Sequence, residues 1–131
     1  MNDQPTGLAC ICNDQGVIQR VLLDGIGIQS LTCGESLEKS IHPGSRAKWL
    51  SFLVELRTKG TAVNWEINFV GSDHLETIQV SGAGQNDLLM IMGSLNFRDS
   101  LAICSKFREK DEEQADQLYA AIQNHIRAIE D

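Results

Sequence analysis

The feature that most constrains the fold of this sequence is a change of hydrophobic period at Gly60. Before Gly60, apolar residues recur at the i, i+3, i+4 and i+7 spacing of an amphipathic helix, at Trp49, Phe52, Leu53 and Leu56. After Gly60 the period becomes two, and the apolar positions are Val63, Trp65, Ile67 and Phe69. Ser45 is the expected N-cap of this helix and Gly60 its C-terminal stop. The sequence therefore predicts a helix followed at once by a half-buried strand.

Short apolar runs between turn residues predict four more strands. Leu8–Cys12 and Val17–Leu23 flank a segment of Asn, Asp and Gly, which tolerate positive φ, so these runs predict a hairpin. Leu75–Ser81 and Leu88–Met92 follow the strand after Gly60 and predict an antiparallel meander with it. Leu88–Met92 is apolar on both faces, which suits a central strand covered on each side.

The segment from about Arg98 to the end is rich in helix-forming residues and contains no Gly or Pro, so it predicts one long helix. In its second half an apolar seam with 3-4-3-4 spacing passes through Ala115, Leu118, Ile122, His125 and Ile129. The middle of the seam is polar, at Arg108 and Asp111. A helix that packs first on its own domain and later on a partner would have this pattern. We therefore predict a homodimeric coiled coil whose interface is Leu118, Ile122, His125 and Ile129.

Length and charge limit the possible classes of protein. The 131 residues suit one domain, and no run approaches the roughly 18 apolar residues of a membrane-spanning helix. The first residues lack the pattern of a signal peptide. The formal net charge is -7 and the basic residues are not clustered, which disfavours binding to nucleic acid. We expect a soluble cytoplasmic protein that binds neither nucleic acid nor membrane.

The order of predicted elements is two strands, a short helical region, an amphipathic helix, three strands and an exit helix. Over residues 7–97 this order resembles a PAS domain. The segments most similar to the family are 13–18 in the first hairpin, 34–43 before the helix, 52–60 in the helix, 64–67 in the next strand and 88–97 in the closing strand.

The resemblance implies an α+β fold with a five-stranded antiparallel sheet in the order 2-1-5-4-3. It further implies helices on one face and an exit helix that leaves from the central strand. Residues 6–97 would form the PAS-like sensor domain, and residues 98–131 the C-terminal signalling and dimerisation helix. The segment between Leu23 and Gly34 is shorter than in many PAS domains. The resemblance therefore does not establish the size, or the existence, of the ligand pocket that the family usually has.

A small-molecule pocket would lie between the amphipathic helix and the inner face of the sheet, because ligand sites are concave and largely apolar. Its candidate walls are Trp49, Leu53, Trp65, Ile67, Met90 and Met92. The alternative is that these side chains simply fill the core.

The sequence contains no recognisable catalytic or metal-binding motif, so we predict no enzyme, no catalytic residues and no metal site. His42, before Pro43, is a candidate for a haem ligand, and local hydrogen bonding at a helix entrance is the alternative. Cys10, Cys12, Cys33 and Cys104 lack the spacing of redox or zinc motifs, so reduced structural thiols are expected. The pair Cys10 and Cys12 should point to one face of its strand. No cofactor is predicted, with haem as the alternative.

The leading hypothesis is a non-catalytic sensory and dimerisation domain of a signal-transduction protein, such as the input domain of a histidine kinase in a two-component system. It would relay a signal through its C-terminal helix to a downstream output domain such as a kinase, under the control of a partner or an unidentified small molecule. The alternative is a haem- or flavin-dependent protein, or a small enzyme whose site is built from dispersed residues.

Overall fold

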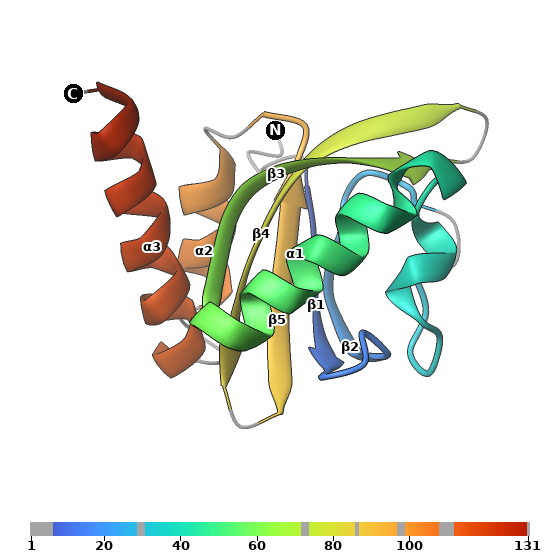
Figure 1. Cartoon of the computed structure of the whole chain (residues 1–131), viewed down its shortest axis with the longest axis horizontal. Coiled ribbons are helices and arrows are strands. Elements are labelled where there is room, and N and C mark those ends of the chain that lie inside the picture. Colours follow the sequence, from blue (N-terminus) through green and yellow to red (C-terminus); the bar gives the residue numbers. More distant parts are fainter. Residues whose placement is uncertain are drawn as a thin grey trace.

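The computed structural model describes residues 7–28, 31–71, 74–85, 87–96, 99–107 and 112–130. The strands are β1 (Gly7–Asn13), β2 (Ile18–Asp24), β3 (Thr61–Val70), β4 (Leu75–Gln85) and β5 (Leu88–Ser94). The helices are two short 3-10 turns, η1 (Leu37–Ser40) and η2 (Pro43–Ser45), and then α1 (Arg46–Lys59), α2 (Asp99–Phe107) and α3 (Glu112–Glu130). Figure 1 shows α1 crossing the sheet, with α2 and α3 side by side at one flank.

The strands pair in the order β2-β1-β5-β4-β3, and every pairing is antiparallel. This confirms the predicted fold class and sheet order. β5 lies between β1 and β4, and its Ile91 pairs with Cys10 on one side and Gly82 on the other. Because both faces of β5 are covered, Leu89 to Met92 are all buried, as the doubly apolar sequence predicted.

α1 ends where the sequence predicts, at Gly60. This residue has φ +84°, which glycine adopts without strain, and its N–H donates to the Leu56 carbonyl at 3.0 Å. Ser45 occupies the N-cap position but makes no capping bond with its side chain. Its hydroxyl instead accepts a hydrogen bond from the Asn68 N–H at 3.1 Å, so it ties the start of α1 to β3.

A β-bulge interrupts β3. Ala62 pairs with Gly82 and Trp65 with Val80, so Val63 and Asn64 together oppose the single residue Ser81. Asn64 has φ +61°, and its N–H donates to the Ser81 hydroxyl at 2.9 Å. The extra residue turns Val63 to the face opposite Trp65, which corrects the predicted alternation in which both share one face.

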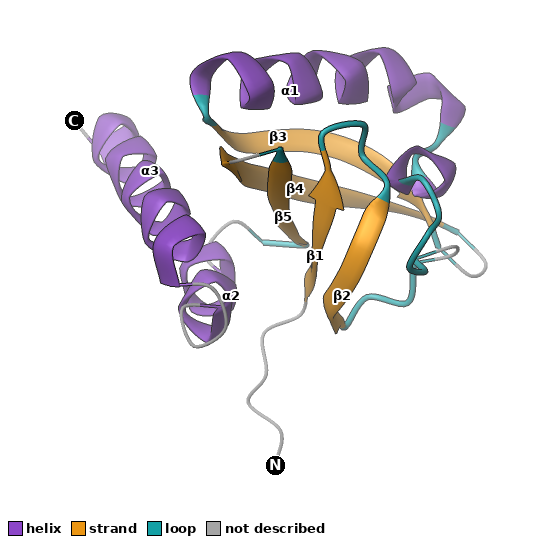
Figure 2. Ribbon diagram, turned by 90° about the horizontal axis from the view of Figure 1, so that it is seen from below, coloured by secondary structure: helices purple, strands orange, loops and turns teal. Residues whose placement is uncertain are grey.

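Figure 2 shows α1 on one side of the sheet and α2 and α3 on the other. A separate hydrophobic core lies on each face. The inner-face core lies under α1 and includes Trp49, Phe52, Leu53, Leu56, Cys10, Cys12, Ile67, Phe69, Ile78, Leu89 and Ile91. The outer-face core lies under α2 and α3 and includes Ala9, Ala83, Met90, Met92, Ile103, Cys104, Ala115, Leu118 and Ile122. The sheet is therefore the middle layer of three.

The prediction of one long C-terminal helix is wrong, because α2 and α3 pack against each other. The Cys104 thiol of α2 donates to the Ala115 carbonyl of α3 at 3.1 Å. Residues 108–111, where the predicted seam is polar, lie outside the described residues. Both apolar ends of the seam are buried on the outer face of the same sheet, one in α2 and the other in α3. No helix in the described part of the chain is long and apolar enough to span a membrane.

Candidate functional site

The six predicted pocket walls do not share one face of the sheet. Trp49, Leu53, Trp65 and Ile67 lie in or against the inner-face core, whereas Met90 and Met92 belong to the outer-face core. The reason is the alternation of side chains in β5, which turns Leu89 and Ile91 inward and the two methionines outward. The sheet therefore separates the methionines from the other four residues.

Aromatic rings occupy the layer between α1 and the sheet. Trp49 stacks on Phe52 with ring centroids 5.4 Å apart, and Phe52 meets the ring of Trp65 edge-on at 5.7 Å. Trp49 and Phe52 are fully buried. The indole N–H of the partly buried Trp65 donates to the Glu55 carboxylate at 3.3 Å. This packing agrees with the alternative that the predicted walls fill the core.

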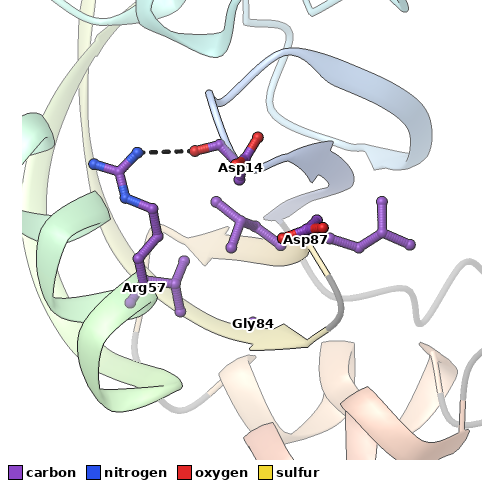
Figure 3. Close-up of a pocket in the computed structure, with 7 residues that line it drawn as sticks. Asp14, Arg57, Gly84 and Asp87 are labelled. Atoms are coloured by element: carbon purple, nitrogen blue, oxygen red, sulfur yellow. Dashed lines mark hydrogen bonds between the residues drawn. The ribbon is translucent and has the colours of Figure 1, made fainter.

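A recess of about 320 Å³ reaches the inner-face core near the C-terminal end of α1 (Figure 3). Its lining residues are Asp14, Leu56, Arg57, Gly84, Asp87, Leu88 and Leu89. Leu56 and Leu89 belong to the inner-face core and are almost fully buried, so the exposed lining combines the apolar Leu88 side chain with polar and charged groups. Figure 3 shows Arg57 reaching from α1 to the Asp14 carbonyl, to which its guanidinium donates at 2.9 Å.

Sequence reasoning did not find this recess. Its residues come from the β1–β2 turn, the end of α1 and the β4–β5 turn, which are far apart in the chain. No local pattern in the sequence indicates that these three segments meet. In the sequence, Arg57 is one of several charged residues of the predicted helix, and Asp87 is one of the polar residues of a predicted turn.

Gly60 connects three elements. Its carbonyl accepts hydrogen bonds from the Gly84 N–H of β4 at 2.9 Å and from the side-chain amide of Gln117 of α3 at 3.2 Å. Its own N–H donates to Leu56 in α1. We call Gly60 with Leu56, Gly84 and Gln117 the Gly60 junction. Because Leu56 and Gly84 also line the recess, the junction links the recess to α3.

A second, more open hollow of about 450 Å³ lies between the end of α1, the start of β3 and α3. Its lining residues are Glu55, Lys59, Thr61, Ala62, Val63, Ala121, Asn124 and His125. Lys59 pairs with Glu55 one turn earlier in α1, at 3.4 Å. Lys59 and Thr61 are the chain neighbours of Gly60, so this hollow also adjoins the Gly60 junction.

The predicted dimer seam has two different environments in α3. Leu118 and Ile122 are fully buried in the outer-face core of their own chain. His125 is half-buried and lines the second hollow, and the side chain of Ile129 lies outside the described residues. A partner could therefore contact Leu118 and Ile122 only if α3 left the sheet.

His42 precedes η2 and forms local hydrogen bonds. Its Nδ1 accepts from the Gly44 N–H at 3.1 Å, and its backbone N–H donates to the Asn68 carbonyl at 2.9 Å. This is the arrangement expected of a histidine at a helix entrance. Haem ligation by His42 stays a prediction, which the absorbance of the purified protein would test.

All four cysteines lie in the described segments, and none of them forms a disulfide. Cys10 and Cys12 are buried on one face of β1 as predicted, with their sulfur atoms 3.7 Å apart. The hydrogen bond with Cys12 and burial raise the pKa of Cys10 well above its usual value, so this thiol stays protonated. Among the described residues, no group of three or more His, Cys, Asp or Glu side chains is placed to hold a metal ion.

No family model matches this chain, and no curated protein matches it in sequence. Solved structures do match. The PAS domain of the quorum-sensing receptor RpfR from Cronobacter turicensis, in complex with BDSF, is 12% identical, with a TM-score of 0.60 over 72% of this chain and 97% of that chain. The PAS-B domain of Drosophila melanogaster Cycle is 11% identical, with a TM-score of 0.54 over 66% and 95%.

A PAS domain from Colwellia psychrerythraea is 19% identical, with a TM-score of 0.52 over 69% of this chain and 86% of that chain. Identities this low carry information about the fold alone. The five-stranded antiparallel sheet of this chain, in the order β2-β1-β5-β4-β3, matches the PAS fold. This chain has the PAS fold.

Proposed function

We propose that this chain is a non-catalytic sensory module that passes a change at the end of α1 to α3. The observation that carries the proposal is the Gly60 junction, where one carbonyl holds both β4 and the Gln117 side chain of α3. The PAS fold supports it, since one structural neighbour is the domain of a quorum-sensing receptor in complex with BDSF. The fold alone does not identify a ligand for this chain.

The input site of the proposed module is the recess of Figure 3. Its charged side chains and the exposed Leu88 suit a small molecule that carries at least one polar group beside a small apolar part. Such a molecule would compete with the Asp14 carbonyl for the Arg57 guanidinium. Since Leu56, adjacent to Arg57, also receives the Gly60 hydrogen bond, binding would shift the end of α1 and with it the junction.

The output is a population shift between two positions of α3. In the docked position, Leu118 and Ile122 are buried on their own sheet. In the released position they become available, and together with His125 and Ile129 they form the predicted seam with a second copy. A downstream output domain, such as a histidine kinase, would read the change in the helix.

The test is Gln117→Ala, which removes the hydrogen bond from α3 to Gly60. We expect faster hydrogen exchange in residues 112–130 and a larger dimeric fraction by light scattering, because the docked position loses a bond worth about 0.5–1.5 kcal/mol. The matched control is Gln123→Ala, which removes the same kind of side chain from the same helix. If Gln117→Ala leaves both exchange and mass as in the wild type, the proposed route is wrong.

A further inference from the structure

The centre of the solvent-facing side of α1 carries no charge. Five exposed residues lie on one arc of about 100° around the helix axis: Ala47, Leu50, Ser51, Val54 and Thr58. We call them the α1 stripe. Their arc lies directly opposite the buried side chains of the same helix. A helix that only faces water normally places its charged residues at this position, so the stripe needs another explanation.

The stripe exposes apolar surface. Leu50 and Val54, four residues apart, are each 52% exposed. The Ser51 hydroxyl donates to the Ala47 carbonyl at 3.2 Å and the Thr58 hydroxyl to the Val54 carbonyl at 2.8 Å. Because both hydroxyls are satisfied within the helix, a partner could cover the stripe without leaving them unpaired.

The borders of the stripe are basic. Arg46 and Arg57 flank one side, and Lys48 and Lys59 flank the other together with Glu55. α1 thus holds four of the eleven Lys and Arg residues of the chain, but only one of its eighteen Asp and Glu residues. A basic helix with an apolar centre, on a protein of net charge -7, is complementary to an acidic apolar partner.

We propose that the α1 stripe is a docking site for an acidic amphipathic helix of another protein. The apolar side of that helix would cover Leu50 and Val54, and its carboxylates would face the basic borders. Pairing of α1 with α1 of a second copy would bring like charges together and is disfavoured. A membrane surface fits less well, because interfacial helices insert Trp and Phe, whereas Trp49 and Phe52 of α1 are buried inward.

The test uses a fluorescein-labelled synthetic helix of about four turns with Leu on one face and Glu on its borders. Fluorescence anisotropy with the full chain should give a Kd in the micromolar range, since two exposed side chains make a small interface. The double variant Leu50→Glu and Val54→Glu should weaken binding by about tenfold or more. The matched control is Leu75→Glu, a similarly exposed leucine on β4, which should bind as the wild type does.

Four results would overturn the proposal. The first is no binding of the acidic peptide, and the second is equal binding of a peptide with Lys in place of Glu. The third is undiminished binding by a double variant whose thermal unfolding is normal. The fourth is a different occupant that depends on Leu50 and Val54: vesicles of phosphatidylglycerol by cosedimentation, or a second copy of the chain by light scattering.

Discussion

The two faces of the sheet are covered by different means. On the inner face, α1 inserts large rings: Trp49 stacks on Phe52, and Phe52 packs edge-on against Trp65 of β3. On the outer face, small and flexible side chains such as Ala9, Met90 and the Ala115 of α3 let two helices lie against the sheet. The packing of α1 is therefore expected to be essential for the folding of the domain. In contrast, α2 and α3 form an outer layer on the sheet, which we call the cover. Substitutions in the inner-face core should therefore destabilise the whole domain, whereas substitutions in the outer-face core should mainly loosen α3.

The largest effect is expected from Phe52→Ala. This fully buried ring contacts both tryptophans, so its loss should cost about 3–5 kcal/mol and lower the free energy of unfolding of the whole domain. Urea denaturation followed by tryptophan fluorescence measures this. Leu50→Ala on the exposed side of the same helix should cost less than about 0.5 kcal/mol. Similar costs for the two variants would mean that α1 does not pack as described.

Leu118→Ala should act on the cover and spare the inner-face core. This α3 side chain is fully buried in the outer-face core, so we expect a loss of about 2–4 kcal/mol from the docking of α3 on the sheet. Hydrogen exchange should quicken in residues 112–130 while residues 46–59 stay protected. Asn124→Ala, at an exposed position of the same helix, is the control. Equal loss of protection in both segments would show that the two faces unfold as one unit.

Gly60→Ala should destabilise the protein by about 1–2 kcal/mol, because its φ of +84° strains any residue with a Cβ. The new Cβ would also lie 3.3 Å from the Gln117 amide nitrogen. Gly27→Ala is the matched control, since Gly27 has φ +81° with no atom near the added Cβ. The two variants share the backbone strain, so a larger cost at Gly60 measures the contact with α3. Equal losses of stability in the two variants would mean that the contact between Gly60 and Gln117 does not stabilise the protein.

The smallest effect concerns pH. The pKa of Cys10 is raised in the folded protein, so above about pH 9 the unfolded state loses this proton while the folded state keeps it. Stability should therefore fall as the pH rises past that value. In Cys10→Ala this part of the fall should be absent, whereas Cys33→Ala, which removes an exposed thiol, should keep it. If stability depends on pH in the same way in both variants, the fall is not caused by the raised pKa of Cys10.

The sequence was sufficient for elements whose signal is local. The change of period at Gly60 predicted α1 and β3, and the doubly apolar run at Leu88–Met92 predicted the central strand. The bulge at Asn64 was missed, because it depends on Ser81, which lies 17 residues away and accepts the Asn64 N–H. The placement of Met90 and Met92 in a pocket was wrong, because alternation alone does not say which face α1 covers.

The candidate site was less predictable than the fold. Gln117 and Gly60 are 57 residues apart, and neither residue carries a motif that points to the other. Leu118 and Ile122 were predicted to form a dimer interface, whereas the chain's own sheet covers them here, because periodicity does not reveal what covers an apolar seam. The α1 stripe was visible only once the buried side of the helix was known.

The most direct test of the link between the two faces is the rate of hydrogen exchange in residues 112–130 of Gly60→Ala and Gly27→Ala. Both variants add a methyl group at a glycine of positive φ, but only Gly60 contacts α3. We predict that Gly60→Ala quickens exchange throughout α3 and that Gly27→Ala leaves it unchanged. Exchange in α3 that is the same in both variants would contradict the proposed transmission through the Gly60 junction.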